Sequence, residues 1–442
     1  SNESINAIAV EASGRITAVG HGVEGGPRGF AVARYNGDGS PDLAFSGDGR
    51  VVTPTSGNGN EQAWGVAVQP DGKIIAAGYS GLEIAVLRYN NDGILDTTFN
   101  GDGKIFMTIY QGGGQSVARG VLVEPNGNIV LAGHAGRGGT SDEDIVIARF
   151  GSDGIPSADF GTFGYIITNP FNEAGGDASV RSVTVQSDGK IVVGANRIAS
   201  SLTTFGLIIR YTPEGALDPT FGSSPTAPGI AGVRVPNTDV TEVNSVILQP
   251  DGKILVAGTY EGFEIVGLFV ARLNSNGSPD TSFGGANNGY AAISSTDGGG
   301  PAQDIVLQPD GKIIVAATAP NLSNQTAEFA VYRLNASGSH DTSFGVNGVA
   351  RNDVGIGNDV PFAIALQLDG RILIGGATNF AANSNADVAV LRFTSNGVLD
   401  CGFGIGGKVI TPLSGLTEVI SDIKLQSDGK IVASGAKCDN LG

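Results

Sequence analysis

Seven times along the chain an arginine ends an apolar stretch, and in six of these copies an aspartate stands eight residues later. A guanidinium at the end of a buried strand needs an acceptor, which a carboxylate or a backbone carbonyl provides. Because a catalytic site needs only one such pair, we expect the repeated pairs to brace the fold. They are Arg34–Asp42, Arg88–Asp96, Arg210–Asp218, Arg272–Asp280, Arg333–Asp341 and Arg392–Asp400. In the remaining copy Ser157 replaces the aspartate, and we expect Asp159 to accept from Arg149.

Two of the segments that follow the arginine carry the spacing Asn-x-Asp-Gly-x-x-Asp, which resembles a compact calcium loop. Their carboxylates are Asp38, Asp42, Asp92 and Asp96. A calcium ion takes roughly 6–8 oxygen ligands, and the later copies of the segment lose these oxygens. A turn built on one aspartate oxygen tolerates all of these changes. We therefore interpret the segments as turns and expect no metal there.

A further set of side chains varies from copy to copy at one position, eight residues before a recurring turn glycine. Two residues later the chain holds only Ile or Val, which indicates packing between sheets. If the strand carrying both positions is the innermost of its sheet, the varied side chains surround the mouth of a central channel. Arginines, amides and aromatic rings there suit a polar or sugar-like ligand. The candidate ligand-binding residues are Asn6, Trp64, Arg119, Arg181, Asn244, Gln303 and Phe362, and Ser421 occupies the eighth copy of the position.

This channel-mouth set contains no carboxylate or histidine that would serve as a general base. The three histidines, His21, His134 and His340, stand in different copies of the repeat, so a metal cluster is not expected. Nucleophile elbows, phosphate-binding loops and paired metal ligands of standard spacing are absent. We expect no cofactor and no catalysis. The enzymatic alternative, a polysaccharide lyase or hydrolase of the propeller type, would need an acid–base cluster at the channel mouth.

The elements that must position these residues follow from an internal repeat. A turn glycine, usually within Asp-Gly-Lys-Ile, recurs at intervals of 55 to 63 residues, near 59 on average. The unit around Gly72 reads as four short strands near 65–69, 73–78, 83–90 and 104–108, with tight turns and no helical period. The glycines are Gly14, Gly72, Gly127, Gly189, Gly252, Gly311, Gly370 and Gly429.

The second and third strands of each unit are apolar almost without alternation, so both faces of each small sheet are expected to be buried. Four-stranded antiparallel sheets that repeat radially form a β-propeller. The chain has eight copies of the first hairpin but only seven of the third and fourth strands. We expect residues 1–415 to form seven blades that close the ring, with 416–442 an additional half-repeat at the ring seam. Eight blades are the alternative.

The length variation of the repeat is confined to two of its four connections. From each arginine to a recurring phenylalanine the distance is always 11 residues, whereas the second-to-third and fourth-to-first connections vary. These variable loops share one face of the propeller, because neighbouring strands are antiparallel. Recognition usually lies on loops of a rigid scaffold, so we expect the ligand on this face. The phenylalanines are Phe45, Phe99, Phe160, Phe221, Phe283, Phe344 and Phe403.

The pattern of LQPDGKILVAG at 248–258 followed by FVARLNSNGSPDTSFGG at 269–285 resembles the delta-60 repeat, a bacterial repeat of nearly this period. The resemblance extends over almost the whole chain, since three anchor residues recur in register. It implies a β-propeller in an exported protein and carries no assigned chemistry. The copy with Ser157 departs most from the pattern.

The chain has 26 Lys and Arg against 43 Asp and Glu, a net charge of −17, which disfavours nucleic acid and anionic membranes as partners. No apolar run is long enough to span a bilayer. Its two cysteines, Cys401 and Cys438, are expected on opposite faces as free thiols. We expect a non-catalytic binding or scaffold propeller at the bacterial exterior, surface or periplasm, with a glycan, surface polymer or protein as ligand. The structural alternative is a surface protein that self-associates through its C-terminal half-repeat.

Overall fold

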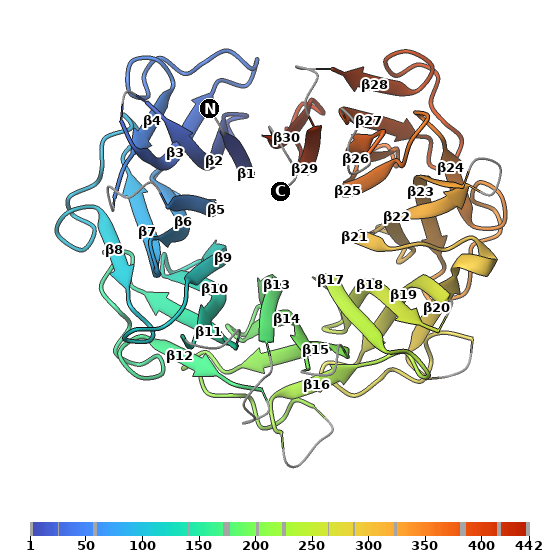
Figure 1. The fold of residues 1–442 in the computed structure, drawn as a ribbon, viewed down its shortest axis with the longest axis horizontal. Helices are drawn as coiled ribbons and strands as arrows, with labels where there is room; N and C mark the ends of the chain where they lie inside the picture. The colour runs from blue at the N-terminus through green and yellow to red at the C-terminus, as the bar shows by residue number, and fades with distance from the viewer. Residues whose placement is uncertain are drawn as a thin grey trace.

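The computed structural model describes residues 3–24, 26–55, 60–138, 142–170, 177–199, 203–222, 227–263, 265–285, 288–321, 325–380, 386–412 and 417–438. These residues form β-strands and one short 3₁₀ helix, η1 (Ser295–Asp297). The strands are arranged as antiparallel blades around a centre (Figure 1). The sequence prediction of an all-β propeller with four-stranded antiparallel blades is confirmed.

Seven blades have four strands each, paired in chain order from the centre outward. Blades 1 and 2 are β1 (Ser4–Val10), β2 (Ile16–Val23), β3 (Arg28–Tyr35), β4 (Arg50–Thr53) and β5 (Glu61–Val68), β6 (Ile74–Ser80), β7 (Glu83–Tyr89), β8 (Lys104–Met107). Blades 3 and 4 are β9 (Ser116–Val123), β10 (Ile129–Gly136), β11 (Glu143–Phe150), β12 (Tyr165–Thr168) and β13 (Asp177–Val185), β14 (Ile191–Ile198), β15 (Thr204–Tyr211), β16 (Ile230–Val233).

The remaining blades repeat this order. Blades 5 and 6 are β17 (Val240–Leu248), β18 (Ile254–Gly262), β19 (Ile265–Leu273), β20 (Tyr290–Ser294) and β21 (Ala302–Leu307), β22 (Ile313–Asn321), β23 (Thr326–Leu334), β24 (Val349–Asn352). Blade 7 is β25 (Val360–Leu366), β26 (Ile372–Thr378), β27 (Asp387–Phe393) and β28 (Lys408–Thr411). The chain then forms one more hairpin, β29 (Thr417–Leu425) and β30 (Ile431–Cys438).

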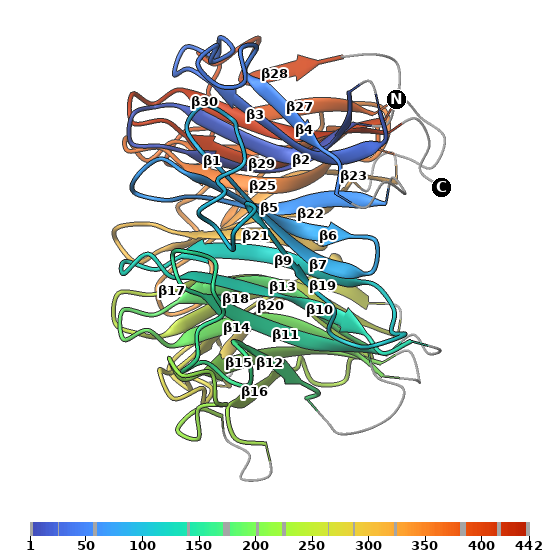
Figure 2. The same ribbon diagram turned by 90° about the vertical axis from the view of Figure 1, so that its left-hand side faces the viewer.

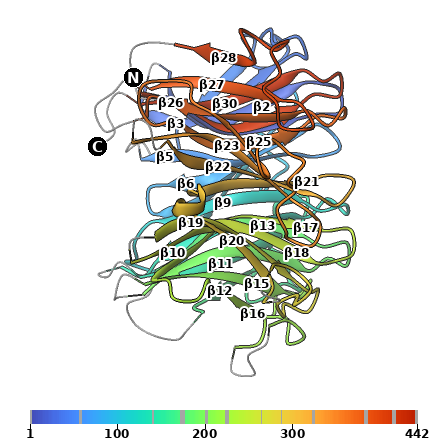
Figure 3. The ribbon, with the colours of Figure 1, turned by 90° about the vertical axis from the view of Figure 1, so that its right-hand side faces the viewer.

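The hydrophobic core lies between the blades. One cluster packs Leu268 and Ile293 of blade 5 against Ile305 and Ile313 of blade 6. The second and third strands are buried on both faces, as β10 shows along its whole length. Seen edge-on, the strands run between the two faces of the ring (Figures 2 and 3). The unbroken apolar runs in the sequence therefore arise because each sheet is covered by a neighbour on either side.

The β29–β30 hairpin lies in the ring between blade 7 and blade 1 (Figure 1). Ile420 and Ile423 of β29 pack against Ala363 and Leu373 of blade 7, as the first strand of any blade packs against the blade before it. β30 in turn pairs with β1. The hairpin that we expected as an additional half-repeat at the ring seam thus occupies a place in the ring itself. In the described part of the chain, seven positions of the ring hold four strands and an eighth holds two.

Candidate functional site

The channel-mouth residues share one structural feature, a β-bulge. In every copy the innermost strand carries one residue more than its partner strand at this position, so that residue is left out of the pairing register. A bulge re-aims its side chain and is common beside functional sites. The bulged residues are Asn6, Trp64, Arg119, Arg181, Asn244, Gln303, Phe362 and Ser421.

The bulge turns two arginines away from the packed interior. Arg119 and Arg181 are exposed, although Ala118 and Val180 directly before them are buried. The strands that carry them, β9 and β13, lie side by side at the inner edge of the ring (Figure 1). An ordinary strand register would alternate these positions strictly between the two faces of the sheet. The bulge therefore lets a charged side chain reach solvent from the innermost strand.

Arg119 stacks on the chain's single tryptophan. Its guanidinium carbon lies 4.4 Å from the centre of the Trp64 ring, although Trp64 belongs to blade 2 and Arg119 to blade 3. Desolvation among the surrounding strands and the positive charge of Arg181 lower the pKa of Arg119. The Trp64 indole nitrogen is buried, with no hydrogen-bond partner among the described residues. Cationic charge, an aromatic ring and an unused donor thus gather in one place.

Other members of the set have structural partners instead. The Asn6 amide nitrogen donates to the Ala63 carbonyl of the next blade at 2.6 Å. Asn244 does the same with the Ala302 carbonyl at 2.7 Å. Phe362 packs edge-on against Phe380, with 6.2 Å between ring centres. The structure therefore divides the predicted ring: these asparagines tie blades together, whereas the arginines beside Trp64 are open to a ligand.

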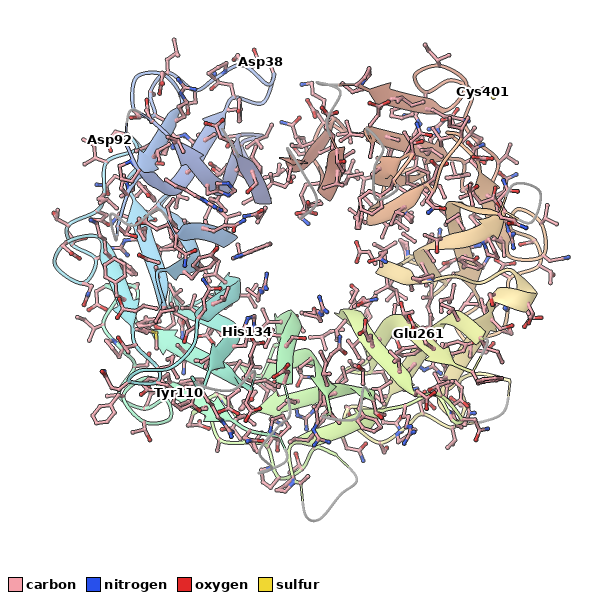
Figure 4. The ribbon with its side chains drawn as sticks, in the orientation of Figure 1. Asp38, Asp92, Tyr110, His134, Glu261 and Cys401 are labelled. Atoms are coloured by element: carbon pink, nitrogen blue, oxygen red, sulfur yellow. The ribbon has the colours of Figure 1, made fainter. Side chains whose placement is uncertain are left out.

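A histidine, His134, lies close enough to the two arginines to be influenced by their charge. His134, which is labelled in Figure 4, is buried. Its Nε2 is 3.7 Å from Oε1 of Glu143. Burial, with the charges of Arg119 and Arg181, lowers the pKa of His134 to about 4. Burial and the charge of Asp177 raise the pKa of Glu143. Because His134 is neutral at pH 7 and shielded from solvent, it adds no positive charge near the arginines and offers no accessible base.

The repeated arginines form the ion pairs that we named from the sequence, with N–O distances of 2.7 to 2.8 Å in all six copies. The copy with Ser157 differs from our expectation. Arg149 pairs with Glu124 at 2.9 Å, not with Asp159. Glu124 stands where other copies have a glutamine such as Gln69, so the carboxylate has moved from one turn to the other.

Among the described residues, six of the seven arginines, all but Arg392, also donate to a backbone carbonyl of the next blade. Arg333 pairs with Asp341 at 2.8 Å and stacks on the Phe344 ring at 4.5 Å. Its Nη1 donates to the Ser395 carbonyl in the third-to-fourth-strand turn of blade 7 at 2.5 Å. Arg34 reaches the Asn91 carbonyl of blade 2 at 2.5 Å in the same way. The recurring arginine is therefore an architectural clamp and not a site residue.

The four carboxylates considered as calcium ligands already have partners close to them in the fold. Asp42 and Asp96 belong to the ion pairs above. Asp38 accepts from the backbone nitrogen of Ser40 at 2.9 Å, and Asp92 from that of Ile94 at 3.1 Å. Figure 4 shows Asp38 and Asp92 on separate turns. Among the described residues, no three His, Cys, Asp or Glu side chains gather in a way that would hold a metal.

Cys401 is an exposed free thiol, and the side chain of Cys438 lies outside the described residues. Among the described residues, no helix is long and apolar enough to cross a membrane.

Fold and site together define a β-propeller. A family model described as a domain of unknown function (DUF5122) beta-propeller matches residues 11–45, 69–99, 186–221, 249–283, 308–344 and 367–403. Each match ends at one of the recurring phenylalanines, and the copy with Ser157 lies outside the matched stretches. The chain thus carries repeats of a β-propeller repeat family. No curated protein matches its sequence.

Solved structures share the fold at low identity. The crystal structure of Sqt1 from Chaetomium thermophilum is 13% identical, with 98% of this chain and 93% of that chain covered and a TM-score of 0.52. The same protein bound to the N-terminus of the ribosomal protein L10 is 11% identical, with 98% and 94% covered and a TM-score of 0.50. At these identities the likeness concerns the fold alone.

Proposed function

We propose that this propeller is a non-catalytic binding scaffold that takes an anionic ligand at Trp64, Arg119 and Arg181. The observation that carries the proposal is the placement of two exposed arginines on neighbouring bulges, one of them stacked on the only tryptophan. A guanidinium gives paired hydrogen bonds to a carboxylate or sulfate group. An aromatic ring beside it suits the apolar face of a sugar.

An acidic glycan fits this surface best. The protein carries a net charge of −17, so two adjacent exposed arginines form a local exception to its overall field. A polyanion would be repelled by most of the molecule and held at this point only, which favours a short acidic stretch of a polymer. Together with the resemblance to an exported bacterial repeat, this leads us to propose a bacterial surface polymer as the source of the ligand. Acidic peptides are included in the same binding experiment, because they carry the same anionic groups.

A glycan and peptide array probed with the labelled protein tests the proposal. We expect acidic oligosaccharides to be retained, neutral oligosaccharides of equal length to be lost, and retention to weaken as salt rises. The double variant Arg119→Ala with Arg181→Ala removes two positive charges and should lose the signal. The matched control is Arg50→Ala with Arg371→Ala, which removes the same charge from side chains that are 68% and 43% exposed. Equal loss in both variants would contradict the proposed site.

A further inference from the structure

A cavity of about 780 Å³ lies between blade 7 and blade 1, where Figure 1 shows the ring open outside the β29–β30 hairpin. We call it the seam. One wall is made by β2, β3 and β4, with Val32 and Val51 among its residues. The other wall is made by blade 7 and the hairpin, with Val388, Val390 and Ile431. The lining is largely apolar. A folded protein normally covers an apolar surface of this kind.

The seam is the place of two strands that every complete blade has. In blade 3 the second strand, β10, pairs with the third strand, β11, through eight residue pairs. In the described part of the chain, β30 has β29 on one edge and meets β1 on the other at one residue pair, Ser4 with Ala436. An open strand edge of this kind accepts a further strand.

The contact between blades 6 and 7 shows what normally fills this place. The blade 7 turn presses Gly397 onto the Phe344 ring of blade 6, so that a Cβ on Gly397 would lie 3.0 Å from it. The Gly345 nitrogen donates to the Asn396 carbonyl at 2.9 Å, and Arg333 donates to the Ser395 carbonyl. Blades 1 to 6 each hold the third-to-fourth-strand turn of the following blade through a backbone hydrogen bond of this kind.

Blade 7 has the same holding groups without a turn to hold. Arg392 pairs with Asp400 and stacks on Phe403, but in the described residues it reaches no carbonyl of a following turn. Its side chain is 20% exposed, against 7% for Arg333. Phe403 is only half-buried, whereas Phe344 is fully buried. The Val390 side chain of β27 is likewise half-buried.

On the other side of the seam, within the described residues, the turn between the third and fourth strands of blade 1 lacks the contacts that the equivalent turn of blade 7 makes with blade 6. Its turn glycine, Gly39, has no atom within 4 Å of a Cβ position, although the equivalent Gly397 lies against a phenylalanine. The Gly37 carbonyl, where a clamp arginine would donate, accepts from Gln426 at 3.1 Å and from Lys430 at 3.4 Å. The turn is held in part by the hairpin, and among the described residues no aromatic ring lies within 4 Å of the Gly39 Cβ position.

We propose that the seam binds a β-hairpin of this repeat's own third-and-fourth-strand type, supplied by a polypeptide segment outside residues 1–442. The segment would complete an eighth blade. Its chemistry is an apolar strand that ends in arginine, an aspartate eight residues later and a phenylalanine eleven residues later. The arginine would grip Gly37, the phenylalanine would meet Gly39, and the turn would accept from Arg392. A second copy is a poor donor, because its own third and fourth strands already lie between packed blades.

The test uses residues 326–352, the third and fourth strands of blade 6, as a soluble peptide added to the full chain. We expect one peptide to bind per chain by calorimetry and to raise the melting temperature. It should also displace an apolar dye such as anilinonaphthalene sulfonate from the seam. The peptide with Arg333→Ala should bind at least about tenfold more weakly, since a buried charge-assisted contact is worth more than 1.4 kcal/mol.

Variants of the protein test whether the peptide binds at the seam. Arg392→Ala should weaken binding while the chain stays folded, and Val390→Asp should abolish it. The matched control is Ile94→Asp on blade 2, because Ile94 is 64% exposed. Because an isolated hairpin is marginally stable, the same segment is also fused behind Gly442 through a flexible linker, where it should raise the melting temperature by several degrees. Failure of both peptide and fusion to bind, or dimerisation of the chain that covers the seam, would overturn the proposal.

Discussion

The guanidinium of Arg119 lies 4.4 Å from the ring centre of Trp64, and the two residues come from the innermost strands of different blades. Both stand on β-bulges, which are the only irregularities in their strand pairs. A stacked cation and ring of this kind contributes roughly 0.5–2 kcal/mol, too little to be needed for the stability of a large ring. This small contribution is consistent with our proposal that the pair serves a ligand and is not a brace.

Replacing Arg210 by alanine is expected to lower the free energy of unfolding by about 3–5 kcal/mol, because it leaves a buried carboxylate without its main partner. Arg210 pairs with Asp218 at 2.8 Å, stacks on Phe221 and donates to the Ser275 carbonyl of the next blade. The equivalent change at Arg392 should cost less, about 1–2 kcal/mol, since within the described part of the chain Arg392 reaches no following blade. Urea unfolding of both variants measures the difference. Equal losses would show that the clamp between blades adds nothing.

His134 is expected to make the fold sensitive to mild acid. Its pKa is about 4 in the folded chain against 6.5 in an exposed histidine, so the unfolded chain binds the proton first as the pH falls. Stability due to this group is therefore present above pH 6.5 and lost between pH 6.5 and 4, by roughly 3 kcal/mol in all. The difference in unfolding free energy between wild type and His134→Gln, followed from pH 7 to pH 4, isolates this contribution.

The same titration needs a histidine that is not buried as its control. His340 is exposed in a turn of blade 6, and His340→Gln is the matched control substitution. In Arg119→Ala the pKa of His134 should rise, because one of the charges that depress it is removed. Proton NMR of the imidazole ring measures this directly. A His134 pKa near 6.5 in the wild-type chain would contradict the described burial.

Asp92 distinguishes a turn from a metal site. Its side chain accepts from the Ile94 nitrogen, so Asp92→Asn keeps an acceptor and should change stability by less than about 0.5 kcal/mol. Asp92→Ala removes the acceptor and should cost about 1 kcal/mol. Millimolar calcium should leave the melting temperature of all three proteins in place. A calcium-induced rise of roughly 10 °C in wild type, lost in Asp92→Asn, would identify a metal site.

Strands and blades could be predicted because each unit repeats its turn glycine, arginine and phenylalanine in register. The bulges were not predicted, although the sequence holds a signal for them. Gly78, opposite the Trp64 bulge, would place a Cβ 1.9 Å from the Gln62 carbonyl oxygen, so only glycine fits. Glycine recurs there, six residues after the turn glycine, in six of the eight copies. The spacing of these glycines alone does not show that each one lies opposite a β-bulge in the neighbouring strand.

Contacts between residues far apart in the sequence could not be predicted from it. His134 owes its low pKa partly to Arg181, which stands 47 positions later on the neighbouring blade. Arg149 found Glu124 because the first and third strands of one blade end at the same face, whereas the nearer Asp159 was favoured by sequence distance alone. The position of the β29–β30 hairpin could not be predicted for the same reason, because it depends on packing between distant residues. Counting strands shows that two are absent, but only the packing of Ile420 on Leu373 places the hairpin inside the ring.

Trp64 fluorescence tests the binding site most directly, because this is the only tryptophan in the chain and it lies in the proposed site. Titration with an acidic oligosaccharide, such as oligogalacturonate, should change its emission in a saturable way, and a neutral oligosaccharide of equal length should not. The change should disappear in Arg119→Ala with Arg181→Ala while the melting temperature stays within a few degrees. Unaltered binding by that variant, or emission that no acidic ligand changes, would contradict the account.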